Sequence, residues 1–547
     1  MWLGGVEEEA IEPFRWECPD STEMKILQDL VRDLKLTTPE ALRNPGKETA
    51  SINVPGAFEV AQLLAQNKHL HEMPFFRILP SGEIELCETW SKAVYSLENI
   101  LRRTWWKRIW TAQEAFLPER AVIHVGPHTL PYATFLEAAN SWGHHVHSFS
   151  RSRWENCCLP IFSLWLGYTP TLQPLAFFDS IEALKTLKDA RDNLESGSVA
   201  HNLFLLAIQR SATIRHDYVY GLFGLIMEFF HLDESPNYKS DLSRVFVTTT
   251  LKFMEKAKHL CLLPYSRPHR EHDPDQDRPY ANELPSWCPD WSDDAWRDYF
   301  DIYNYGGFTS DNKQCYNGER QSDTILKLQG TLVGAVPVVA PLIPDMRVPP
   351  ADFVPTIQAW LNLAQSKGLQ PEAVWEIIHV ATHQDVGLKV VESQAAWWEM
   401  LKGLADIDAT FDDMQDAAKQ NNFLPCVSSM NWLDKRAVFV TEPISPLSER
   451  NSDEISKYEY ALQQGSIGLA LPFIREGDFI YIVQGGRTPF IFRPLSNASQ
   501  RSKAKEAGIP EAELSNCFTL VGVCYIYGMM QGQALAENPR WKQIYLL

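Results

Sequence analysis

The alternation of apolar and polar positions divides the chain into a mixed N-terminal part, a helical middle and a strand-rich C-terminal part. In the helical parts, apolar residues recur with the spacing of an amphipathic helix. Short β-branched and aromatic runs bounded by Gly or Pro indicate strands. These patterns predict helices at 58–66, 202–210, 218–230 and 245–258, and strands at 121–125, 325–339, 437–441, 479–484, 490–492 and 518–527.

The order of these elements indicates an α/β fold, then a mostly helical region, then a C-terminal β-rich, barrel-like module. A Gly-Gly pair at 485–486 lies between two predicted strands and predicts a hairpin turn. The domain boundaries that we expect are 1–130, 131–292 and 293–547, with a helical insertion at about 351–420 in the last domain.

The run at 103–114 joins indoles, cations and a carboxylate within one predicted helix. On that helix Trp106, Trp110 and Gln113 fall on a single face, and Glu114 borders it. Indoles on the inward face of a helix usually belong to a core. We therefore expect both indoles to be buried, and this face to be the candidate binding surface if the run lines a site instead.

The carboxylate of Glu114 has two interpretations. A buried charge without a partner is costly, so Arg103 or Arg108 would neutralise it in a packed core. Alternatively, Glu114 faces a cleft and performs chemistry. The residues alone leave both interpretations open.

A second aromatic pair lies in the Pro-rich segment at 284–292. Trp287 and Trp291 flank Asp290, which would accept hydrogen bonds from backbone or indole N–H groups. We expect the pair to clamp the helical region to the β-rich module. The alternative is that the two indoles line a ligand pocket.

Six pieces of the chain resemble, in the same order, the conserved blocks of the fungal heterokaryon-incompatibility (HET) domain family and its downstream region. The pattern Arg-x-Trp-aromatic-x-Arg-aliphatic-Trp-x-x-Gln-Glu at 103–114 resembles the third signature block. The other pieces include a Trp-Leu-Gly strand, a Pro-Ser-Trp segment and a Gly-Asp turn. The six pieces lie at 2–4, 103–114, 210–225, 284–292, 477–493 and 521–532.

The resemblance implies a protein of fungal non-self recognition that acts in vegetative incompatibility and regulated cell death. In the family, two further blocks precede the Trp-Leu-Gly strand, whereas here that strand begins at residue 2. We therefore expect a partial HET domain, through natural truncation or a gene model that lacks 5′ exons. Such a chain would be without activity alone.

The HET fold resembles TIR domains, some of which cleave NAD at the nicotinamide glycosidic bond. This resemblance implies that Glu114 is the catalytic carboxylate and that NAD is the substrate; no cofactor or metal is expected. The carboxylate would stabilise the positive charge on the ribose as nicotinamide leaves, and a neighbouring indole would stack on the rings. The pattern also implies structural roles for Arg215, Asp217, Tyr220, Gly477, Asp478 and Arg493.

Composition narrows the classes of partner. The net charge is −19, and no basic run exceeds two residues, so nucleic-acid binding is not expected. The ten Cys residues include no C-x-x-C pair, and no signal peptide precedes them, which indicates a reducing, cytoplasmic compartment. The longest apolar run, at 332–343, is too short to span a membrane. The expected partner is a protein or a small molecule.

Three functions remain open from the sequence. The first is a HET-family effector of cell death, regulated by the helical and β-rich regions. The second is an enzyme of fungal specialised metabolism that uses the aromatic-rich scaffold to shape a pocket. The third is an inert remnant.

Overall fold

The computed structural model describes most of the chain outside the N-terminal region and several long loops. The described residues are 53–66, 76–78, 84–86, 93, 96, 97, 99–101, 103–118, 120–147, 196–230, 235–266, 284–292, 309–311, 315–322, 324–343, 348–378, 387–421, 423, 433, 436–442, 465–535 and 541–547. They belong to two compact units, one of 1–194 with 205–233 and the other of 195–204 with 234–547. The Trp-Leu-Gly piece at 2–4 lies outside the described residues.

The first unit contains the helix predicted at 58–66, which is confirmed as α3 (Val54–Ala65). It begins where the Asn53 side chain accepts a hydrogen bond from the Gly56 N–H at 2.9 Å. The strand predicted at 121–125 is confirmed as β3. The elements around them are β1 (Phe76–Ile78), β2 (Ile84–Leu86), β3 (Val122–Val125), β4 (His128–Pro131) and α7 (Tyr132–His147).

The strand β3 pairs with β4 in an antiparallel hairpin. In the described part of the first unit, β1 and β2 form another two-stranded antiparallel pair. These pairs and the flanking helices confirm a mixed helix and strand content. The expected α/β sheet is not seen among the described residues, where these two pairs are the strands of this unit.

The helices expected between 196 and 258 are present, with one interruption. The predicted helix at 218–230 divides into two because the chain turns at Gly221 and Leu222. Gly221 N–H returns to the Asp217 carbonyl at 2.7 Å, which closes the first short helix. The elements are α10 (Ser196–Ile208), α11 (Asp217–Tyr220), α12 (Phe223–Phe230), α13 (Leu242–Ala257) and the 3-10 turn η4 (Leu263–Tyr265).

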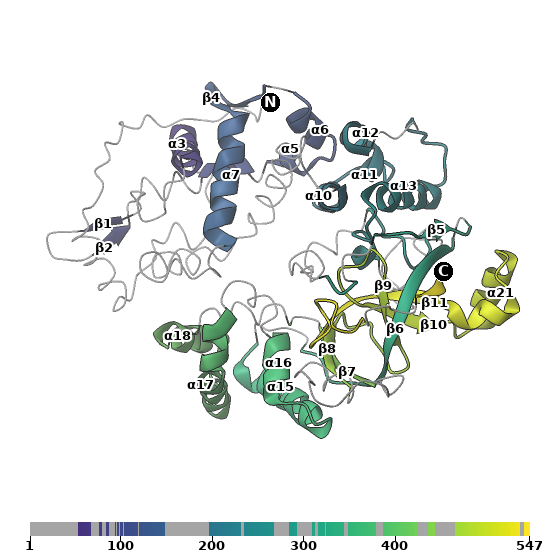
Figure 1. The fold of residues 1–547 in the computed structure, drawn as a ribbon. Helices are drawn as coiled ribbons and strands as arrows, with labels where there is room; N and C mark the ends of the chain where they lie inside the picture. The colour runs from purple at the N-terminus through teal and green to yellow at the C-terminus, as the bar shows by residue number, and fades with distance from the viewer. Residues whose placement is uncertain are drawn as a thin grey trace. The chain divides into compact units, whose positions relative to one another are not determined.

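The C-terminal strands predicted from short apolar runs are confirmed and form one sheet (Figure 1). Its pairs are antiparallel except for β11 with β12. The pairings close into a circuit that runs β6, β9, β10, β11, β8, β7 and back to β6. The strands are β5 (Glu319–Arg320), β6 (Leu326–Val339), β7 (Ala437–Glu442), β8 (Ile467–Ala470), β9 (Phe479–Val483), β10 (Phe490–Pro494), β11 (Cys517–Ile526) and β12 (Lys542–Leu546).

The helical insertion expected at about 351–420 is confirmed and packs on this sheet. Trp360 and Trp397 are fully buried in a core shared with Val438 and Leu469 of the strands. The Trp360 indole donates to the Pro341 carbonyl at 2.8 Å, which fixes the first helix beside the end of β6. The helices are α15 (Pro350–Ser366), α16 (Pro371–Ile378), α17 (Gly387–Asp406) and α18 (Phe411–Gln420), and α21 (Ala498–Glu506) and the 3-10 turn η8 (Glu511–Asn516) follow later.

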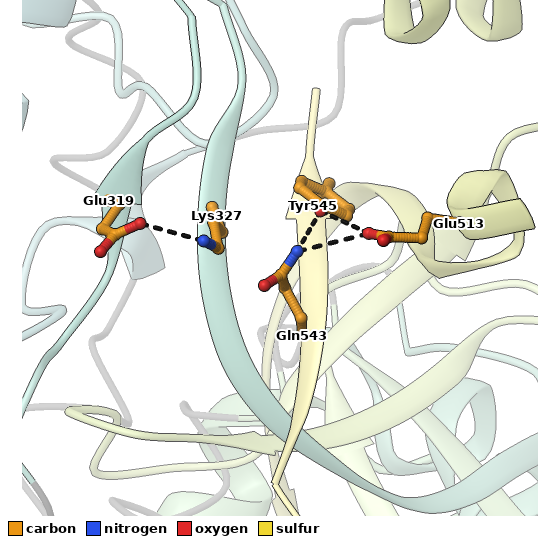
Figure 2. A network of polar contacts seen from close by, with 5 residues as sticks. All are labelled: Glu319, Lys327, Glu513, Gln543 and Tyr545. Carbon is orange, nitrogen blue, oxygen red and sulfur yellow. Dashed lines mark hydrogen bonds and ion pairs between the residues drawn. The ribbon is translucent and has the colours of Figure 1, made fainter. Parts of the chain in front are cut away.

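Side chains on β12 hold that strand to η8 (Figure 2). The Tyr545 hydroxyl donates to Glu513 Oε2 at 2.5 Å, and the Gln543 amide donates to the same oxygen and to the Tyr545 hydroxyl. Burial, together with the neighbouring Glu513 carboxylate, raises the pKa of Tyr545 to about 12, so the phenol keeps its proton. The Lys327–Glu319 ion pair at 3.0 Å links β6 to β5 in the same view.

In the part of the chain that the structure describes, every helix is too short or too polar to cross a bilayer.

Candidate functional site

The run at 103–114 forms two short helices instead of the single helix that its pattern predicts. They are α5 (Thr104–Lys107) and α6 (Thr111–Phe116). The helix breaks at Arg108, whose ψ of 134° is extended. The extended residue pairs with Ser211, whose N–H donates to the Lys107 carbonyl at 2.6 Å and whose carbonyl accepts from Ile109 at 3.1 Å. A contact distant in sequence therefore overrides the local helical pattern.

The break sends the two indoles of the run to different environments. Trp106 is 1% exposed, stacks on Phe135 and donates its indole N–H to the Ile100 carbonyl at 2.9 Å. Trp110 is 39% exposed, so the expectation that both indoles are buried is right for Trp106 and wrong for Trp110. The Trp110 indole N–H donates to Asp217 Oδ2 at 3.1 Å.

The amide of Gln113 bonds to the backbone of the segment at 220–224 in both directions. Its Nε2 donates to the Gly221 carbonyl at 2.7 Å, and its Oε1 accepts from the Gly224 N–H at 3.1 Å. The two partners of the first bond are 108 positions apart in the sequence. Gln113 thus closes the turn between α11 and α12, where backbone groups have no helical partner.

The two glycines of this turn allow the close approach. A Cβ atom on Gly224 would lie 2.2 Å from Gln113 Oε1, and one on Gly221 would lie 2.8 Å from Ile109 Cγ2. A side chain at Gly224 would displace the Gln113 amide, and one at Gly221 would displace the Ile109 side chain. We call the contacts of Trp110 and Gln113 with 217–224 the motif clamp.

Glu114 lies exposed at the end of this cluster. The ion pairs found among the described residues do not include it, so the expected pairing with Arg103 or Arg108 is not observed there. The Glu114 carboxylate is exposed to solvent, whereas the neighbouring Gln113 amide bonds to backbone groups. The structure therefore brings Glu114 and Trp110 to the surface together.

Besides its part in the motif clamp, the segment at 210–220 contains buried charged side chains. Asp217 is buried and begins α11, and Tyr220 is buried on the same helix, while Arg215 is partly exposed before it. Arg210, which sequence reasoning did not select, is 1% exposed close to Tyr132.

Burial lowers the pKa of the Arg210 guanidinium to about 10, and Tyr132 acts in the opposite direction. At neutral pH the guanidinium therefore stays charged inside the unit. The available sequence signal is its place as the first residue of the piece at 210–225 that resembles the HET family.

The segment at 284–292 packs as the expected clamp within the second unit. Trp287 and Trp291 are fully buried, and their indoles donate to the Thr324 carbonyl at 3.2 Å and to Thr250 Oγ1 at 3.1 Å. Asp290 accepts from the backbone and hydroxyl of Ser292, at 2.9 and 2.7 Å.

Sequence reasoning missed two residues in this segment. Ser286 bonds through its backbone N–H and hydroxyl to the Leu547 carbonyl, and its Oγ accepts from Leu520 N–H at 2.9 Å. Burial raises the pKa of the Cys288 thiol, which disfavours a nucleophilic thiolate. Ser286 therefore holds the segment against the C-terminal residue and β11.

The Gly-Asp piece forms a buried ion pair at the start of β9. Arg493 on β10 donates from Nε to Asp478 Oδ1 at 2.8 Å and from Nη2 to Oδ2 at 3.0 Å. The Asp478 side chain is 1% exposed, and it also accepts from the Arg475 N–H at 2.8 Å. Gly477 precedes it with a φ of +87°, a conformation that glycine adopts readily.

The predicted site residues therefore form three separate clusters. The motif clamp belongs to the first unit, and the two others belong to the second. In the described residues no three His, Cys, Asp or Glu side chains are grouped to hold a metal ion.

The comparisons with known proteins support a HET-like class for the chain. It is similar to Heterokaryon incompatibility protein 6, OR allele, of Neurospora crassa, with 23% identity over 501 residues, which cover 83% of this chain and 68% of that protein. No family model matches the chain. No solved structure matches it either.

Proposed function

We propose that the chain acts in fungal non-self recognition, as a protein of vegetative incompatibility that leads to regulated cell death. The similarity over 83% of the chain to a heterokaryon-incompatibility protein supports this proposal. The contacts of Gln113 carry it, because two pieces that resemble the HET family bond to each other rather than to unrelated chain. Residues that resemble a family by chance would not be expected to meet in this way.

We assign the effector role to the unit that contains the motif clamp, with a partial, TIR-like HET domain in it. The unit with the β-sheet regulates the effector or binds a protein partner. Separate compact units support a division of labour of this kind. Both units act in the cytoplasm under this proposal.

Glu114 distinguishes two routes to cell death. In one route the effector cleaves NAD, and Glu114 stabilises the positive charge that develops on the ribose. Its exposure beside the partly exposed Trp110 supports an accessible carboxylate near an aromatic surface. In the other route death proceeds through a protein partner, and Glu114 has no chemical part.

Deletion of the gene in the source fungus tests the proposal. The parent and the deletion strain are paired with a panel of isolates, and the recovery of viable heterokaryons is scored. We expect the deletion to widen the set of compatible isolates. An unchanged set would contradict the proposal, and an altered profile of secreted small molecules with that unchanged set would favour an enzyme of specialised metabolism.

Complementation of the deletion then separates the two routes. Glu114→Gln keeps the shape of the side chain and removes its charge, and total NAD is measured in fused cells. NAD loss that requires Glu114 supports the enzymatic route, whereas death without NAD loss supports the partner route. Glu59→Gln, on an exposed position of α3 in the same unit, is the matched control.

A further inference from the structure

The turn between β9 and β10, at 484–488, is enclosed by chain from elsewhere in the second unit. The Gly485 N–H donates to Asp311 Oδ2 at 3.1 Å, and the Gly485 carbonyl accepts from the Leu260 N–H at 2.9 Å. A Cβ atom on Gly485 would lie 2.8 Å from the Tyr316 backbone nitrogen. Glycine is needed here both for this approach and for its φ of +84°.

Three buried side-chain oxygens belong to this turn or to the segment at 309–311 that bonds to it. They are Ser310 Oγ, Thr488 Oγ1 and Gln484 Oε1, and none has a hydrogen-bond partner within the described part of the chain. Ser310 and Thr488 are both fully buried. The Ser310 N–H donates to the Arg487 carbonyl at 3.0 Å, which places Ser310 beside the residue that follows Arg487.

Buried hydroxyls without partners are destabilising, and folded proteins contain few of them. An internal water commonly satisfies such groups with about three hydrogen bonds. Two hydroxyls can each donate or accept, whereas the Gln484 carbonyl oxygen only accepts. This set suits a water, which has two donors and two acceptor positions. The same set suits a hard cation poorly. Ca²⁺, for example, is bound by six or more oxygens, and carboxylates are usually among them.

We propose that the β9–β10 turn binds an internal water molecule, held by Ser310 Oγ, Thr488 Oγ1 and Gln484 Oε1. The water joins the turn to the segment at 309–311. It therefore helps to hold the piece at 477–493 that resembles the HET family, independently of the function proposed above. The ligand of this site is therefore a small, neutral, polar molecule.

A double-mutant cycle on the full-length chain tests the shared water. Ser310→Ala and Thr488→Val each remove one hydroxyl, and amide hydrogen exchange of the segment at 479–493 is followed by mass spectrometry. Each single change should speed exchange of that segment by about threefold to tenfold, the effect of one net hydrogen bond. Amide exchange in the double variant should be no faster than in whichever single variant exchanges faster, because both hydroxyls bind the same water.

Amide exchange that is unchanged or slower in the single variants would overturn the proposal, because the hydroxyls would then not stabilise the turn. Independent effects that multiply in the double variant would also overturn it. Thr488→Ser keeps the hydroxyl and removes only a methyl group, so it should retain near-normal exchange where Thr488→Val does not. A crystal structure should show a water within hydrogen-bond distance of both hydroxyls, and a metal ion or a direct Ser310–Thr488 bond there would refute the assignment.

Discussion

Gln113→Ala should loosen the turn between α11 and α12 more than a typical surface substitution does. The change removes the bond to the Gly221 carbonyl at 2.7 Å and the bond from the Gly224 N–H at 3.1 Å. Each is worth about 1 kcal/mol net, and up to about 3 kcal/mol where the abandoned group stays buried. Gly221 is buried and Gly224 is partly exposed, so we expect a total of about 2–4 kcal/mol.

Hydrogen exchange of the segment at 217–230 is the appropriate assay. Two compact units make a single global unfolding transition a poor reference, whereas local exchange reports the turn itself. The expected loss corresponds to exchange that is about thirtyfold to a thousandfold faster in that segment. Gln113→Glu should give an intermediate result, because a carboxylate still accepts from Gly224 but cannot donate to Gly221.

The control is Gln358→Ala, on the exposed face of α15, which should change stability by less than about 0.5 kcal/mol. If Gln113→Ala behaves like this control, the two backbone bonds do not hold the turn. The physical explanation of the motif clamp would then fail.

Three further outcomes follow from burial and charge, each measured on the urea-unfolding transition of the unit that contains the changed residue. Trp106→Ala should cost about 3–5 kcal/mol, the usual range for a core aromatic, whereas Trp110→Ala should cost less than about 2 kcal/mol because its indole is 39% exposed; equal costs would contradict this. Asp478→Ala should cost about 3–5 kcal/mol, because the Arg493 guanidinium loses its buried partner; a near-neutral result would count against the pair. Burial and then the nearby Arg487 lower the pKa of His259 to about 3, so the unfolded chain binds that proton more readily. Stability should therefore fall as the pH drops below about 6.5, by about 1–2 kcal/mol at pH 5, and His259→Gln should remove that share of the slope.

Local patterns were sufficient to predict the C-terminal strands β6, β7, β9, β10 and β11 and the hairpin between β9 and β10, but not β5, β8 or β12. The apolar runs at 479–483 and 490–494 are short, rich in β-branched and aromatic residues, and separated by a Gly-Gly pair. Gly485 adopts the positive φ that such a turn requires. Nothing local opposes this outcome, so sequence and structure agree.

The run at 103–116 shows why a good local pattern can still mislead. Its apolar spacing fits one helix, yet Arg108 is extended because it pairs with Ser211. Pairing partners that far apart leave no trace in the periodicity of either segment. The exposure of Trp110 follows from the same break, so this error also misplaced a candidate site residue.

The sequence predicted which residues belong to the candidate site more readily than it predicted the contacts of those residues. Resemblance selected Gln113, Asp217 and Tyr220, but only the fold shows that the Gln113 amide bonds to the backbone of the second piece. The buried Arg210 was not selected, because burial of a cation depends on packing that no single segment encodes.

The central claim is that the motif clamp supports a function in incompatibility. It is tested most directly by the fraction of dying cells after hyphal fusion with an incompatible isolate. The deletion strain is complemented with the wild-type chain or with Gln113→Ala, at matched protein levels. We predict that the wild-type chain restores cell death and that Gln113→Ala restores much less. Equal restoration of death by the wild-type chain and by Gln113→Ala would contradict the role of the motif clamp, and equal death in the parent and the deletion strain would contradict the function itself.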